Sequence, residues 1–117
     1  MPRKPARKAA TTATRPPDAE TRPTVLVDAE NVRRSTWPNI TPDELVELSR
    51  AWAEEHEVEV VVVFEKEDET ADEWLIREAG RYKPYWLVTS DRELRRRAGR
   101  EAERIVGGGA FLGELIR

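Results

Sequence analysis

Four acidic residues stand beside the apolar runs of this chain, at positions where carboxylates can act together. Asp28, Glu65 and Asp91 follow three successive apolar runs, and Asp72 opens the segment between the second and third. Carboxylates that share one crevice repel each other unless a cation lies between them. Oxygen ligands without histidine or cysteine select Mg²⁺ or Mn²⁺. These residue types therefore predict metal-dependent hydrolysis of a phosphodiester, in which the ion orients water and neutralises charge.

The elements that must position these acids follow from the apolar and polar periodicity. Strands are predicted at 24–28, 58–64, 85–89 and 104–106, and helices at 41–55, 70–80, 91–99 and 111–116. The valine-rich second run is typical of a strand covered on both faces. Alternation of this kind predicts an α/β fold, a compact three-layer Rossmann-like domain with a mostly parallel sheet of about four strands. Ligands of such sheets bind beyond the carboxyl ends of the strands, where the acids would meet.

Three helix starts carry the Ser/Thr-x-x-Glu pattern of a capping box, at 41–44, 70–73 and 90–93. Acids in the first turn of a helix are also favoured by the helix dipole, so Asp72 and Asp91 have a purely structural alternative. The glycine run 107–109 lacks the lysine and Ser/Thr of a phosphate-binding P-loop and is predicted to be a tight turn.

Composition limits the class of protein. The 117 residues are 38% hydrophobic and 37% charged, which suits one small core. The chain has no cysteine and one histidine, which excludes disulfide frameworks, thiolate zinc sites and His-rich metal sites. No apolar run approaches the roughly 18 residues of a membrane span, and no signal-peptide core is present. We expect a cytoplasmic protein without a membrane partner.

Charge divides the chain unevenly. Residues 1–22 carry six basic and two acidic side chains with four prolines, whereas residues 23–117 carry 14 basic and 21 acidic side chains. The leading segment has no large aliphatic or aromatic side chain apart from Met1. It is therefore predicted to be a disordered basic tail, which either touches nucleic acid or only solubilises the chain.

Three motifs then resemble one nuclease family. Segment 27–32 (VDAENV) resembles the D-G-x-N motif of NYN domains, a branch of the PIN-like nucleases. Segments 69–73 (ETADE) and 88–94 (VTSDREL) are similar to the E-T-A-D-E and V-T-S-D-R-x-L motifs of its YacP-like branch, and 106–111 (VGGGAF) resembles the closing segment. The motifs follow the family's order, and the domain they imply covers 23–117.

The resemblance implies an endoribonuclease that cleaves RNA with Mg²⁺ or Mn²⁺. It implies that the catalytic metal ligands are Asp28, Asp72 and Asp91, with Asn31 as a polar residue of the site. The fourth acid is Glu65, is Glu69 or is absent, because the chain is shorter than the family between these positions.

Basic and aromatic residues near the crevice are candidates for RNA contacts: Arg33, Arg34, Trp37, Arg92 and Arg96. Arginines at four-residue spacing share a helix face and could bind phosphates, although a solvated face is the alternative. Trp37 could stack on an unpaired base or pack in a core. The expected partner is RNA, single-stranded or ribosome-associated. Two other functions stay open: an RNA- or ribosome-binding module that cleaves poorly, and a phosphatase-like hydrolase of small molecules.

Overall fold

The computed structural model describes residues 22–117, in which four strands form a single parallel sheet. The strands are β1 (Thr24–Asp28), β2 (Glu59–Val63), β3 (Tyr85–Val88) and β4 (Arg104–Val106), in the order β2-β1-β3-β4. Every neighbouring pair is parallel. The α/β class and the parallel sheet of four strands are confirmed. The chain reverses its direction of travel across the sheet between β1 and β3, which is where such folds place a ligand site.

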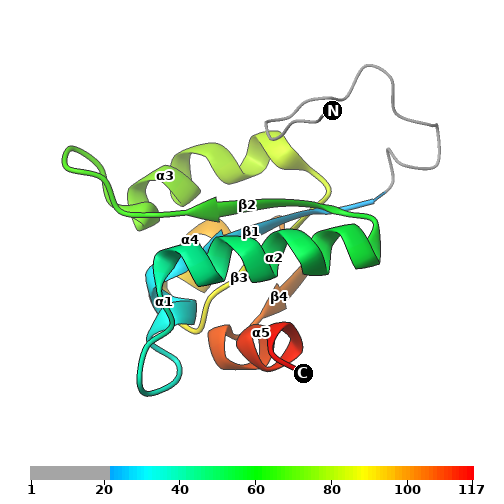
Figure 1. Cartoon of the computed structure of the whole chain (residues 1–117). Coiled ribbons are helices and arrows are strands. Elements are labelled where there is room, and N and C mark those ends of the chain that lie inside the picture. Colours follow the sequence, from blue (N-terminus) through cyan, green and yellow to red (C-terminus); the bar gives the residue numbers. More distant parts are fainter. Residues whose placement is uncertain (1–21) are drawn as a thin grey trace.

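Helices cover both faces of this sheet, so the fold has three layers. The helices are α1 (Ala29–Arg33), α2 (Pro42–His56), α3 (Ala71–Glu78), the short 3₁₀ helix η4 (Ala79–Tyr82), α4 (Arg92–Ala98) and α5 (Gly108–Leu115). Figure 1 shows α2 lying across one face of the sheet with α5 beside it. The core on that face also takes in α1, while α3, η4 and α4 pack on the other face.

Each face of the sheet has its own apolar core, because successive strand residues point to opposite sides. Val25 and Val27 of β1 point into the core with α1, α2 and α5, which contains Trp52 and Phe111. Leu26, between them, points into the core with α3 and α4. All three β1 residues are fully buried. The central strand that ends in Asp28 is thereby fixed from both sides.

Two of the three capping boxes are confirmed. The Thr41 hydroxyl accepts from the Glu44 backbone N–H at 3.1 Å, and the Glu44 carboxylate accepts from the Thr41 N–H at 2.9 Å. Thr70 and Glu73 repeat this arrangement at the start of α3. Since the boxes fix where α2 and α3 begin, they also place Asp43 and Asp72 at matching positions in the first turns.

Several expectations about the elements were wrong. Helix α1 was missed, because five residues are too few to show a helical period. Strand β2 does pack against the cores on both faces, as predicted, but it is the outer strand and four of its five residues are only half-buried. The glycine run 107–109 is not a free-standing turn, since Gly108 and Gly109 form the first turn of α5. A Cβ on Gly108 would lie 2.3 Å from Asn31 Oδ1, so this close approach requires glycine.

The predicted disordered tail comprises residues 1–22, of which 1–21 lie outside the described residues. Arg22, the last residue assigned to that tail, donates from its guanidinium to the Glu57 carbonyl at 3.2 Å. Within residues 22–117, no helix has both the length and the apolar character needed to cross a membrane.

Candidate functional site

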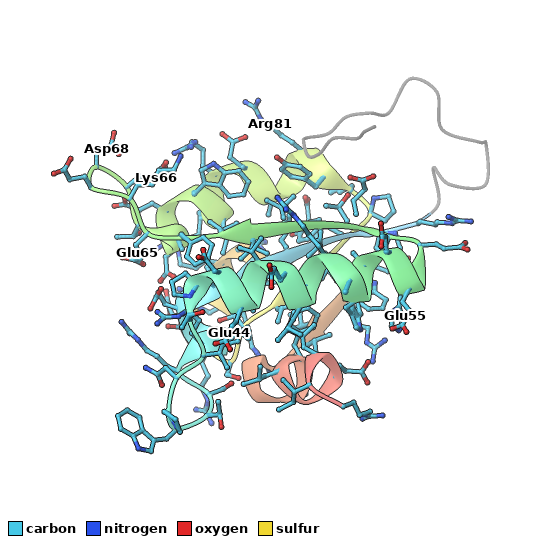
Figure 2. The ribbon with its side chains drawn as sticks, viewed as in Figure 1. Glu44, Glu55, Glu65, Lys66, Asp68 and Arg81 are labelled. Atoms are coloured by element: carbon cyan, nitrogen blue, oxygen red, sulfur yellow. The ribbon has the colours of Figure 1, made fainter. Side chains whose placement is uncertain are left out.

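A pocket of about 550 Å³ opens at the carboxyl edge of the sheet. Four of its five acidic lining residues come from the end of β1, the residue two positions after β2, the first turn of α3 and the start of α4: Asp28, Glu65, Asp72 and Asp91. Figure 2 shows Glu65 at the base of the loop that follows β2. The other lining residues are Glu30, Asn31, Arg34, Ser35, Ser90 and Gly109. Residues distant in sequence are therefore gathered at one edge, as the topology predicted.

Asp28 is the most enclosed of the four acids, with only 6% of its surface exposed. Burial raises the pKa of its carboxyl group above 3.8, and the nearby Asp72 and Asp91 raise it further. The Thr89 hydroxyl donates to Asp28 Oδ2 at 2.8 Å, which lowers this pKa and partly offsets the burial. A buried carboxylate with like-charged neighbours is favourable only if something neutralises it.

Asp72 has a raised pKa for the same kinds of reason. Burial is the largest cause, followed by repulsion from Asp91, Glu65 and Glu73. The side chain is half-buried in the first turn of α3, where the helix dipole favours a negative charge. Burial and the surrounding carboxylates therefore act against this dipole interaction.

The segment that connects β3 to α4 is held by side-chain hydrogen bonds. Asp91 Oδ1 accepts from the Leu94 N–H at 2.9 Å and so caps α4. The Thr89 hydroxyl accepts from the Asp91 N–H at 3.2 Å, so one hydroxyl links Asp91 to Asp28. The third predicted capping box is wrong, because Asp91 and not Ser90 occupies the cap position. The Ser90 hydroxyl instead accepts from the Gly108 N–H at 2.8 Å.

Asn31 joins the two halves of the pocket wall. Its side-chain oxygen accepts from the Ser90 N–H at 2.8 Å, which ties α1 to the β3–α4 connection. The structure thus places Asn31 in the pocket, where the resemblance had implied a polar residue.

The two candidates for the fourth acid lie in different surroundings. Glu65 lines the pocket, and its carboxylate accepts from the Ala71 N–H at 3.4 Å, at the start of α3. Glu69 does not line it and forms an ion pair with Arg77 of α3. Of the two, only Glu65 is available to a ligand of the pocket.

The donor chemistry of the pocket fits a hard divalent cation, because the charged donors are all carboxylate oxygens. Their spacing is not that of a closed cage: in residues 22–117, no three acidic or histidine side chains lie close enough to hold one ion. Mg²⁺ is commonly bound by only one or two carboxylates, several waters and the phosphates of a substrate. The pocket lining supplies carboxylates of this kind.

The predicted RNA-binding residues are not equally available. Arg33 is engaged within the fold, since it donates to the Ile40 carbonyl and to Glu30 at 2.7 Å each. Arg34 lines the pocket with 70% of its side chain exposed. Trp37 follows on the same loop and is 87% exposed, so packing in a core is excluded for it.

Arg92 and Arg96 lie on α4, next to the pocket in sequence but outside its lining. Both are exposed, and Arg96 forms an ion pair with Glu93 of the same helix.

Sequence reasoning missed three residues that shape the site. Thr89 is fully buried and its hydroxyl donates a hydrogen bond to Asp28. The sequence feature that could have indicated this role is a hydroxyl residue between an apolar strand and an acid. Glu30 lines the pocket and holds Arg33 and Arg34. Arg95 donates to the Thr89 carbonyl at 2.8 Å, a contact that its place in a run of arginines concealed.

The fold and the site define a class: a three-layer α/β domain whose carboxylate pocket lies at the switch point of a parallel sheet. Comparisons with models of known families, with curated proteins and with solved structures find no match to this chain. The pocket geometry and the sequence motifs therefore carry the functional argument.

Proposed function

We propose that this chain is a metal-dependent endoribonuclease of the PIN-like, NYN type. The observation that carries the proposal is the pocket at the ends of β1 and β3, lined by Asp28, Glu65, Asp72 and Asp91. The raised pKa values of Asp28 and Asp72 support it, because they reflect the burial of these carboxylates first and then the repulsion from neighbouring acids. The motifs at 27–32, 69–73 and 88–94 add their resemblance to that family.

A bound Mg²⁺ or Mn²⁺ supplies charge neutralisation at the scissile phosphate and lowers the pKa of the attacking water. The protein contributes rigid placement of the carboxylates. Thr89 fixes Asp28 by a hydrogen bond, and the Leu94 N–H fixes Asp91. A raised pKa makes ionised Asp28 and Asp72 stronger bases, which suits cation binding and acceptance of a proton from water.

RNA is the proposed substrate because exposed cationic and aromatic side chains lie beside the acidic pocket. Arg34 stands on the wall and Trp37 on the adjoining loop, where a phosphate and an unpaired base could be bound together. Arg92 and Arg96 extend the positive charge along α4. We propose the cytoplasm, where RNA is found, as the location of this ribonuclease.

A second candidate is an RNA- or ribosome-binding module with little cleavage activity. The spacing of the carboxylates favours it, since no three of them in residues 22–117 are close enough for one ion. RNA would then be bound by Arg34, Trp37, Arg92 and Arg96, and the acids of the pocket would have only structural roles.

Incubation of the protein with an end-labelled single-stranded RNA separates these functions. The proposal predicts internal cleavage with Mn²⁺ or Mg²⁺ and none with EDTA. Retention of the RNA without cleavage in any metal would identify a binding module. Hydrolysis of p-nitrophenyl phosphate without RNA cleavage would identify a phosphatase-like enzyme. Either result would contradict the proposed function.

A further inference from the structure

A second hollow, a groove of about 840 Å³, lies between the last turns of α2 and the end of α5. Helix α2 ends just before β2 begins, and α5 ends after running back from the carboxyl end of β4. The groove therefore lies at the amino end of the parallel sheet, opposite the carboxylate pocket. Figure 1 shows the ends of α2 and α5 on the same side as the start of β1. Nothing in the proposed RNA cleavage uses this groove.

The groove has an apolar floor and an acidic rim. Leu48, Trp52 and Leu115 contribute apolar surface, and the His56 ring stacks on Trp52 with 4.4 Å between centroids. The rim carries three exposed carboxylates and one cation: Glu54, Glu55, Glu114 and Arg117. Glu114 already accepts from Trp52 Nε1 at 3.3 Å and pairs with Arg117 at 3.7 Å, so Glu54 and Glu55 form the acidic part of the rim that faces a ligand. Lysine and arginine place an aliphatic stem on apolar surface and a charged head at its edge. A basic peptide is the ligand that this combination fits.

The chain itself supplies such a peptide at this end of the domain. Arg22 contacts Glu57, directly after α2, through its carbonyl and its carboxylate at 3.2 Å each. Upstream of it, residues 3–15 carry five cations and no acid. Arg15 lies seven positions before Arg22, a stretch that spans at most about 25 Å when extended. Because the segment is tethered beside the groove, its effective concentration there is high.

We propose that the groove between α2 and α5 binds the basic segment 3–15 of the same chain. The cationic heads lie at Glu54 and Glu55 on the rim, and the stems cover the floor. The segment is thereby held at the end of the sheet opposite the carboxylate pocket, and its cations are not RNA contacts.

A spin label tests this, because the chain has no cysteine and one can be introduced at a chosen site. Ala9→Cys carries a nitroxide, and paramagnetic broadening is measured on the backbone amides of the full chain. At about 0.1 M salt, the strongest broadening is expected at 54–56 and 114–115. At about 1 M salt, where the screening length falls to about 3 Å, the broadening should be lost.

Charge reversal provides the matched control. Glu54→Lys with Glu55→Lys should remove the broadening, because it replaces two rim carboxylates with cations that repel the basic segment. Both residues are exposed, so the fold should be retained. Glu67→Lys with Asp68→Lys makes the same charge change on the exposed loop after β2 and should preserve it. An unlabelled spectrum of each variant checks that the fold is retained.

Three results would overturn the proposal. The strongest broadening could fall on pocket amides such as those of Ser90 and Asp91, or on no amide of the groove. It could persist at 54–56 after Glu54→Lys with Glu55→Lys. It could also appear on isotope-labelled chains mixed with separate spin-labelled chains, which would assign the groove to the segment of a second copy. None of these measurements depends on RNA cleavage.

Discussion

Replacing Asp72 with asparagine removes one negative charge from the carboxylate pocket while keeping the size of the side chain. The pKa of Asp72 is raised by burial and by repulsion from Asp91 and Glu65. A carboxyl group with a raised pKa is less stable in its ionised form in the folded state than in the unfolded state. At pH 7 in EDTA, Asp72→Asn should therefore raise the melting temperature.

The opposing term is the interaction of Asp72 with the dipole of α3. Its loss costs about 0.3–1 kcal/mol. For a domain of this size, each kcal/mol moves the melting temperature by about 4–8 °C, so this loss alone would lower it by roughly 1–8 °C. The melting temperature of Asp72→Asn rises only if relief from burial and repulsion stabilises the fold by more than the lost dipole interaction.

Asp43 offers a matched control for the dipole term. It occupies the same place in α2 that Asp72 occupies in α3, two residues after a capping threonine and one before the glutamate of a capping box. It is exposed and does not line the pocket. Asp43→Asn should lose only the dipole interaction and melt lower than the wild type.

Thermal melts of the three proteins, in EDTA and with Mg²⁺ or Mn²⁺, decide the matter. The wild type and Asp43→Asn should gain about 2.7 kcal/mol when the free metal is about 100 times its dissociation constant. Asp72→Asn should gain less. If Asp72→Asn melts lower in EDTA by the same amount as Asp43→Asn and keeps the full metal response, Asp72 is only a helix-end residue and our reasoning is refuted.

Three further predictions concern the same pocket and its surroundings. Thr89→Val removes the hydroxyl that bonds Asp28, and should cost about 1.5–3 kcal/mol in urea unfolding at pH 7; an unchanged midpoint would contradict that bond. Because the pKa of Asp28 is raised above 3.8, stability in EDTA should fall as pH rises through the raised value. Asp28→Asn should flatten this slope, and an unaltered slope would assign it to other groups. Arg92→Ala with Arg96→Ala should lower the salt dependence of log K for single-stranded RNA by about 1–2 units, whereas an unchanged slope would remove both from the interface.

The strands could be predicted because their apolar runs are continuous and bounded by polar residues. The class of fold, the parallel sheet and the gathering of Asp28, Asp72 and Asp91 at one edge all followed from that alternation. Two capping boxes also placed the starts of α2 and α3 correctly.

The remaining features depend on contacts between distant segments. Ser90 satisfied the capping pattern, yet Asp91 takes the cap because the Ser90 hydroxyl bonds the start of α5. The glycine run 107–109 was predicted to be a turn because glycine favours turns. Gly108 instead begins α5, and its missing Cβ permits the close approach to Asn31. The sequence does not show whether Glu65 or Glu69 is the fourth acid of the site, because the ion pair between Glu69 and Arg77 forms only in the folded chain. No local sequence pattern predicts these contacts.

Cleavage of an end-labelled single-stranded RNA by the wild type, Asp91→Asn and the control Asp43→Asn tests the central claim most directly. We expect Mn²⁺- or Mg²⁺-dependent cleavage by the wild type and by Asp43→Asn. Asp91→Asn should cleave at least ~10²-fold more slowly while remaining folded, comparable to loss of one electrostatic contact in the transition state. Full activity of Asp91→Asn, or equal cleavage in EDTA, would contradict a carboxylate-bound metal as the basis of this protein's activity.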